Sequence, residues 1–292
     1  MGGASSVSDD VKPPRFEYAA PTSLDEALAG LAEYGDEASV LAGGQSLLPM
    51  MSLRLATPAR LIDIMRIASL RDVSRGEEYV EIGAGVRQAE AGRGAGVRLL
   101  AQALRHVGHV ATRNAGTVCG SIAHADPSGE IPAVALALDA EIILTSVRGT
   151  REVRAGDFFI SPFTTARAPD ELVSALRLPV RNSTTAFLEA TPRLTDKGEF
   201  ATAGVAVSLE RQDDGRIEGA AIALLGVGQT PIRAHEAEML LAAATPTKKL
   251  FAEVADHAAA NIDPEGDIHS GPEHRRRLIR ALTRRALEEA TQ

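Results

Sequence analysis

The feature that most constrains this chain is a short apolar run that breaks into two adjacent glycines and then a hydroxyl residue. The run ends at Leu41, and the loop that follows reads Ala42-Gly43-Gly44-Gln45-Ser46-Leu47. Two glycines at a strand end permit backbone conformations and close approaches that a Cβ atom forbids. Consecutive N–H groups in such a turn form a concave nest that suits a phosphate. Taken alone, the stretch is equally consistent with a tight capped turn.

A second loop of the same character lies further along the chain. It reads Ala115-Gly116-Thr117-Val118-Cys119-Gly120-Ser121, and the acids Asp126 and Glu130 follow it. Two such loops can clamp a diphosphate from two sides. Neither loop matches the G-x-G-x-x-G fingerprint of a dinucleotide-binding Rossmann fold or the phosphate loop that ends in Gly-Lys-Ser/Thr. The sequence therefore argues against a Rossmann fold and against an NTPase.

Composition excludes several other classes of function. The net charge is −8 and no basic stripe is present, which argues against a nucleic-acid partner. The single cysteine cannot hold an iron–sulfur cluster that needs four cysteines of one chain. No apolar run approaches the roughly 18 residues of a membrane span. Residues 1–14 resemble a flexible leader rather than a signal peptide, so we expect a cytoplasmic protein.

Hydrophobic periodicity predicts an α+β chain. A strand at 16–18 is followed by a helix that Ser23 and Glu26 begin with a capping box and that Gly35 ends. The other strands are expected at 39–41, 60–64, 79–82, 141–145 and 171–178, with a hairpin loop at 72–78, and helices at 97–107 and 131–138. Beyond a boundary at 179–183, the pattern predicts an antiparallel hairpin at 203–210 and 217–225, and helices at about 234–243, 247–261 and 273–290. We therefore expect a two-lobed domain over 15–180 and a smaller domain of antiparallel sheet and helices over 181–292.

The two loops together resemble those of the FAD-binding medium subunits of molybdenum hydroxylases, a family that includes carbon monoxide dehydrogenase and xanthine dehydrogenase. That family carries an Ala-Gly-Gly-x-Ser loop and a Thr-Ile-Gly-Gly loop around the FAD diphosphate. The resemblance extends from Phe16 to Ala234 and implies a PCMH-type FAD-binding domain. The cofactor-binding residues that it implies are Leu41, Ala42, Gly43, Gly44, Gln45, Ser46, Leu47, Thr117, Val118, Cys119, Gly120, Ser121, Asp126, Glu130 and Phe200.

Three of these residues have competing interpretations. Glu130 stands where xanthine dehydrogenase-like members place an acid that contacts FAD. Asp126 and Glu130 are equally explained as acids beside the N-terminal dipole of the helix at Ile131. Phe200, in Glu199-Phe200-Ala201, matches a position where some members use an aromatic to cover the isoalloxazine ring. An ordinary core phenylalanine is the alternative.

The chain departs from the family pattern at two positions. Cys119 replaces a glycine, and we expect its side chain to narrow the approach to the cofactor; a small buried residue and a covalent thioether to flavin are the alternatives. Glu189 stands where the family often has lysine, so the role of that lysine does not carry over. We interpret His106, His109 and His124 as capping or surface residues, since no metal-ligating partner is evident. The basic run at 274–277 is expected to be a solvated helix face or a subunit contact.

The family implies an electron-transfer function. Electrons arise at a molybdenum–pterin centre in a large subunit, pass through two [2Fe–2S] clusters in a small subunit, reach FAD in this chain, and leave to NAD⁺, a quinone or oxygen. A dimer of heterotrimers is the expected assembly. No catalytic residue and no metal ligand is expected here, since FAD carries the chemistry. The alternatives are a stand-alone FAD-dependent oxidoreductase acting on an organic substrate and a flavin-free scaffold.

Overall fold

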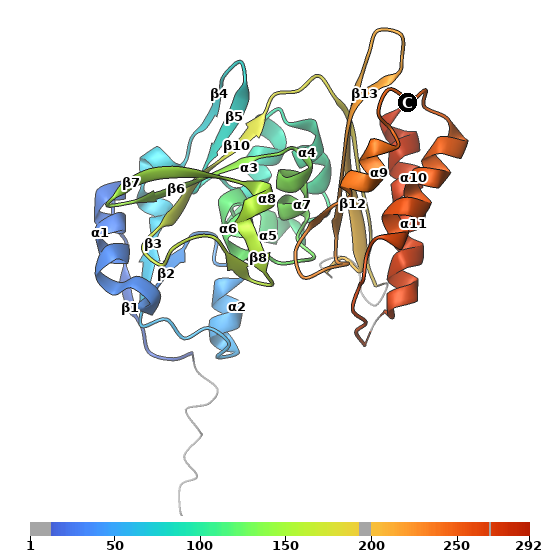
Figure 1. Cartoon of the computed structure of the whole chain (residues 1–292). Helices are drawn as coiled ribbons and strands as arrows, with labels where there is room; N and C mark the ends of the chain where they lie inside the picture. Colours follow the sequence, from blue (N-terminus) through green and yellow to red (C-terminus); the bar gives the residue numbers. More distant parts are fainter. Residues whose placement is uncertain (1–12, 193–199, 269) are drawn as a thin grey trace, which may run out of the picture.

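The computed structural model describes residues 13–192, 200–268 and 270–292, and these residues form an α+β structure (Figure 1). The strands assemble into a three-stranded, a five-stranded, a four-stranded and a two-stranded sheet in this part of the chain. Most of the expected leader and Glu199 lie outside the described residues. No described helix is long and apolar enough to cross a membrane.

The N-terminal lobe is a parallel sheet with one covering helix. Its strands are β1 (Glu17–Ala19), β2 (Ala38–Leu41) and β3 (Arg60–Asp63), and β3 lies between the other two. Helix α1 (Leu24–Tyr34) begins where the Ser23 hydroxyl accepts the N–H of Glu26. The Glu26 carboxylate accepts the N–H of Thr22 instead of that of Ser23, so only half of the predicted capping box forms. Gly35, at a φ of 48°, ends the helix as predicted.

The second lobe contains the five-stranded sheet, in the order β4-β5-β10-β6-β7. These strands are β4 (Val73–Arg75), β5 (Tyr79–Gly83), β10 (Leu172–Pro179), β6 (Glu141–Ser146) and β7 (Gly149–Arg154). The prediction that 72–78 is a loop between two strands of one hairpin is wrong. A tight turn at Gly76 instead makes β4 the antiparallel partner of β5, and β3 belongs to the other sheet.

Short helices connect the strands of both lobes. Helix α2 (Leu47–Ser52) lies between β2 and β3 of the N-terminal lobe, and the others belong to the second lobe. These others are α3 (Gln88–Gly94), α4 (Arg98–Ala103), α5 (Val110–Ala115), α6 (Val118–His124), α7 (Glu130–Ala137) and α8 (Ala155–Phe158). The small hairpin of β8 (Phe159–Ser161) and β9 (Thr164–Thr165) follows α8. Each glycine-rich loop therefore leads directly into a helix, the first into α2 and the second into α6.

The C-terminal part is an antiparallel sheet with helices, as predicted. Its strands are β11 (Thr184–Ala190), β12 (Ala203–Arg211), β13 (Ile217–Leu225) and β14 (Ile232–Arg233), and its helices are α9 (His235–Met239), α10 (Lys248–Ala260) and α11 (Pro272–Ala290). Helices α10 and α11 cover one face, and α4 and α7 contact the other (Figure 1). Successive side chains of β12 point to opposite faces of the sheet. Val205 and Val207 pack in the hydrophobic core with α10 and α11, whereas Ala206 packs in the core of the second lobe. The sequence did not predict β11.

Candidate functional site

A cavity of about 350 Å³ lies where the two glycine-rich loops meet. Both loops line it, together with side chains from β2, α3, α6 and the segment after the β8–β9 hairpin. Ten predicted residues border this cavity: Ala42, Gly43, Gly44, Gln45, Ser46, Leu47, Thr117, Cys119, Gly120 and Ser121. The structure thus brings together two stretches that are distant in the sequence.

Gly43 is the point at which the first loop touches the second. A Cβ atom on Gly43 would lie 2.5 Å from the Gly116 Cα and 2.6 Å from the carbonyl oxygen of Ala115. Only a residue without a side chain allows this approach of two backbones. Gly44 has a φ of 70°, a left-handed conformation that favours glycine, and its added Cβ would lie 2.9 Å from the Leu48 side chain. Gly43 therefore allows the two loops to approach each other, whereas Gly44 allows a left-handed backbone conformation.

The second loop forms a capped turn at the start of α6. The Thr117 hydroxyl accepts the N–H of Gly120 at 3.0 Å, and a Cβ atom on Gly120 would lie 2.7 Å from that hydroxyl. The side chain of Gln88, on α3, donates to the Ser121 hydroxyl at 3.1 Å. Gln88 is buried and lines the cavity, yet its Oε1 atom has no hydrogen-bond partner among the described residues. A buried acceptor of this kind is matched when a ligand supplies a donor.

Two family profiles match nearly the whole chain. Residues 14–181 match "FAD binding domain in molybdopterin dehydrogenase" and residues 187–290 match "CO dehydrogenase flavoprotein C-terminal domain". The chain belongs to the FAD-binding medium subunits of molybdenum hydroxylases. A medium-subunit relative, the carbon monoxide dehydrogenase medium chain of Hydrogenophaga pseudoflava, is 36% identical over 95% of this chain and 98% of its own length.

Other relatives act on other substrates. The 6-hydroxypseudooxynicotine dehydrogenase complex subunit alpha of Paenarthrobacter nicotinovorans is 34% identical over 96% of each chain. The solved structure of quinoline 2-oxidoreductase from Pseudomonas putida 86 superposes with a TM-score of 0.91, at 33% identity over 96% of this chain and 98% of that chain. The solved carbon monoxide dehydrogenase from Hydrogenophaga pseudoflava has a TM-score of 0.90, at 36% identity over 95% and 98% of the two chains. The fold is thus shared with chains from enzymes whose names give different substrates.

The residues at the cavity fit part of an FAD molecule. Gly43 and Gly44 line the cavity, and backbone N–H groups of such a glycine turn suit phosphates. The unpaired Gln88 oxygen suits a hydroxyl of the ribose or ribityl chain, since those hydroxyls are donors. The close contact at Gly43 brings the backbones of the two loops together at the cavity. This medium subunit therefore has the donors and the acceptor that the cofactor needs.

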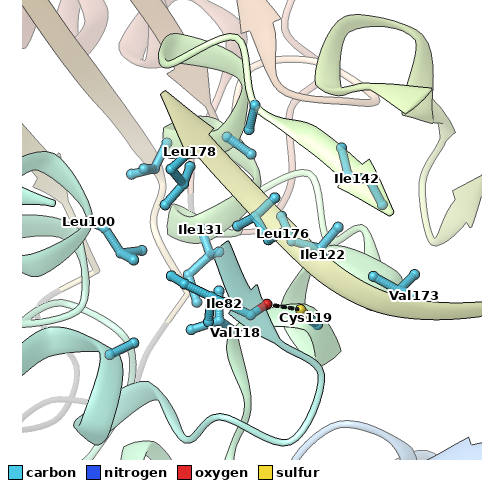
Figure 2. Packing of buried hydrophobic residues seen from close by; sticks show 14 of the residues in the cluster. Ile82, Leu100, Val118, Cys119, Ile122, Ile131, Ile142, Val173, Leu176 and Leu178 are labelled. Carbon is cyan, nitrogen blue, oxygen red and sulfur yellow. Dashed lines mark hydrogen bonds between the residues drawn. The ribbon is translucent and has the colours of Figure 1, made fainter. Parts of the chain in front are cut away.

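Cys119 borders the cavity, but its side chain is buried, and a narrowing of the approach to the cofactor stays a prediction. Its side chain packs in the hydrophobic core with Val118 and Ile122, the other residues on the buried face of α6. The thiol donates to the carbonyl oxygen of Ile82 at 3.4 Å (Figure 2). The rotation of α6 directs the sulfur away from the loops, so the structure favours the small buried residue and not the thioether.

We expect Cys119 to resist thiol reagents in the native protein. Burial, with a smaller effect of Glu81, raises the pKa of this thiol to about 12, which makes its reactive thiolate roughly a thousandfold scarcer than that of a free cysteine. Alkylation followed by mass spectrometry at pH 8 should find the native thiol unmodified and the guanidinium-unfolded thiol fully modified. Rapid stoichiometric modification of the native protein would contradict the core placement.

The other predicted residues do not line this cavity. Leu41, Val118, Asp126, Glu130 and Phe200 are all absent from its wall. Phe200 is 74% exposed, so the alternative of an ordinary core phenylalanine is wrong. The Asp126 carboxylate accepts the N–H of Ser128 at 2.8 Å. A role of these five residues in binding the remainder of the cofactor stays a prediction.

Glu130, at the N-terminus of α7, belongs to an acidic cluster that the sequence did not reveal. Glu189, on β11, is buried and accepts from His106 at 3.3 Å, and its second carboxylate oxygen has no partner among the described residues. The hydrogen bond with Glu189 raises the pKa of His106, which also packs against Phe187. Burial, and then the charge of Glu189, raises the pKa of Glu130 to about 8. At neutral pH the Glu130 carboxyl is therefore protonated and can donate a hydrogen bond.

We expect Glu130→Gln to change how stability depends on pH. In the unfolded chain the Glu130 carboxyl has its ordinary pKa of 4.5, whereas in the folded protein its pKa is about 8. Between these two pH values the carboxyl is ionised in the unfolded state and protonated in the folded state. The wild-type protein therefore loses stability as pH rises through this window. The neutral amide removes the effect, so the melting temperature of the variant relative to the wild type should increase from pH 5 to pH 8. The exposed Glu289→Gln is the control, and an equal difference at both pH values would refute the assignment.

Sequence reasoning missed the cavity residues that come from other elements, and four of them carry polar or aromatic side chains of interest. Gln88 lies on α3, while Phe163, Arg167 and Glu171 lie in or after the β8–β9 hairpin. Phe163 is 55% exposed, has a φ of 58°, and its ring centroid lies 5.1 Å from that of His124, which also lines the cavity. No local motif marks these residues, because only the tertiary structure brings the hairpin over the two loops.

Proposed function

We propose that this chain binds one FAD, non-covalently, at the cavity between its two glycine-rich loops and passes electrons from the iron–sulfur clusters of a partner chain to an acceptor. The observation that carries the proposal is the close approach of the Gly43 and Gly116 backbones, because it places both loops on the wall of one cavity. FAD, when bound, supplies the redox chemistry. The chain itself binds and orients the cofactor: the loop N–H groups hold its phosphates, and Gln88 accepts from a hydroxyl.

The partners follow from family membership. We propose a large molybdopterin-binding subunit and a small iron–sulfur subunit, assembled as a dimer of heterotrimers in the cytoplasm. The buried thiol of Cys119 supports placing the clusters on another chain, since four cysteines are needed for each. The described residues contain no group of three or more His, Cys, Asp or Glu side chains suited to a metal ion. The division at 179–183 is proposed as the boundary between the FAD-binding domain and the C-terminal domain.

Purification from the native host tests this function. We expect the chain to be yellow, to release its flavin into the supernatant on acid precipitation, and to co-purify with chains that hold molybdenum and iron. Flavin that stays with the precipitated protein would contradict the non-covalent proposal. Flavin without associated metal-containing chains would instead favour a stand-alone flavoenzyme. A colourless protein that takes up no FAD would leave the scaffold as the remaining interpretation.

A further inference from the structure

The two cofactor loops hold no positive charge of their own. Residues 41–47 and 115–121 contain neither lysine nor arginine, whereas a diphosphate carries two negative charges. Backbone N–H groups supply only partial charges, and a partly enclosed anion is more strongly held when a full positive charge is near. A full positive charge beside the cofactor can therefore come only from another element that lines the cavity.

Arg167 lines the cavity, and only one nitrogen of its guanidinium donates to described residues. Its Nη1 atom donates to the carbonyl oxygens of Ala168 at 2.9 Å, Pro169 at 3.1 Å and Glu171 at 2.8 Å, which anchors the guanidinium. Its Nε and Nη2 atoms make no hydrogen bond to any described residue. A guanidinium carries five N–H donors in a rigid fork, so the unused edge is suited to an oxyanion.

Nearby acids do not neutralise Arg167. The Glu171 carboxylate, which also lines the cavity, accepts from Arg151 at 2.6 and 2.7 Å and from the N–H of Ala168 at 2.8 Å. Arg148 pairs with Asp170 in the same region. Arg167 forms no ion pair within the described ranges; burial lowers its pKa, the more distant charges of Glu171, Asp36 and Asp170 oppose that effect, and the group stays protonated. The cavity therefore keeps one positive charge that is partly buried and is in no direct ion pair with a described residue.

We propose that Arg167 is the counter-charge of the FAD diphosphate, to which the free edge of its guanidinium donates. The proposal rests on the proposed FAD site and adds a residue from outside the two loops. It makes the affinity for the diphosphate depend on the segment after the β8–β9 hairpin. This segment lies more than forty positions beyond the second loop in the sequence.

The test compares three ligands with the flavin-free full-length chain. FAD and ADP both contain the diphosphate, whereas riboflavin contains only the isoalloxazine ring and the ribityl chain. Arg167→Met removes the charge, Arg167→Lys keeps it, and Arg167→Gln removes it but retains an amide that can donate to the carbonyls at 168–171. Arg148→Met is the matched control, because Arg148 pairs with Asp170 and does not line the cavity. Isothermal titration gives the affinities, and circular dichroism confirms that each variant folds.

We expect Arg167→Met and Arg167→Gln to bind FAD and ADP about tenfold more weakly or worse, with riboflavin unaffected, since a hydrogen bond to a charged group is involved. Arg167→Lys should recover most of the loss, and wild-type affinity should fall more steeply with salt than that of the neutral variants. If the Met variant does not fold, the Gln variant decides. Unchanged ADP binding, or an equal loss for riboflavin, would overturn the role of Arg167 while leaving FAD binding intact. Failure of the wild type to bind FAD would overturn the proposed function as well.

Discussion

Gly43→Ala should reduce FAD affinity by about two orders of magnitude while the chain still folds. The new methyl group would lie 2.5 Å from the Gly116 Cα and 2.6 Å from the Ala115 carbonyl oxygen, so the two loops must separate. Both contacts are to backbone, which cannot rotate away as a side chain can. Misplacing the N–H groups of the loops sacrifices charge-assisted hydrogen bonds worth about 1.5–3 kcal/mol each.

Fluorescence titration of the apo-protein with FAD measures this effect. Gly156→Ala is a suitable control, since Gly156 lies in α8 and an added Cβ meets nothing within 4 Å. Gly44 is a less clear test because its φ of 70° adds backbone strain to the steric effect. If Gly43→Ala binds FAD as tightly as the Gly156→Ala variant, the joined loops are not the diphosphate site.

Arg275→Ala should lower the free energy of unfolding by about 1–3 kcal/mol for each buried carbonyl that loses its donor. Arg275, on α11, is only 8% exposed. Its Nη1 atom donates to the carbonyl of Thr202 at 2.7 Å and to that of Gly226, and its Nη2 atom pairs with Asp267. These bonds tie the last helix to the ends of β12 and β13. The alanine variant would leave two buried carbonyls without their donor.

Urea unfolding of the purified chain, followed by circular dichroism, tests this prediction. Arg277→Ala is the matched control, because Arg277 is exposed on the same helix and should change stability by no more than about 0.5 kcal/mol. Equal midpoints for the two variants would show that the buried bonds of Arg275 are dispensable. The N–H of Gly226 also donates to Pro127 at 2.9 Å. We therefore expect Arg275→Ala to disturb the segment after the second loop too.

Arg275 also corrects the interpretation of the basic run at 274–277. The sequence predicted a solvated face or a subunit contact for the whole run. Helical geometry places successive residues about 100° apart, so a run of four similar side chains cannot share one face. Arg275 faces the sheet, whereas His274 and Arg277 face solvent. The sequence shows that the run is basic, but only the orientation of α11 shows which of its side chains are buried and which are exposed.

Local chemistry made several features predictable. Helix α1 begins after Ser23 and ends at Gly35, and both ends were predictable because helix capping depends only on neighbouring residues. The hairpin of β12 and β13 was predictable from two apolar runs around a turn. The cofactor loops were found for the same reason, since the freedom of glycine is a property of the residue itself. Their meeting at Gly43 and Gly116 agrees with the prediction of two loops that clamp one ligand.

Contacts between distant elements were decided by the tertiary structure alone. The assignment of β3 and β5 to different sheets depends on pairing partners that no local pattern specifies. The direction of the Cys119 thiol depends on the rotation of α6, which is set by packing against β5 and β10. Arg167 reaches the cavity, and Glu189 reaches His106, only because the chain returns from far along the sequence. Backbone propensity acts over a few residues, whereas the charge and shape of a site arise from side chains that folding brings together.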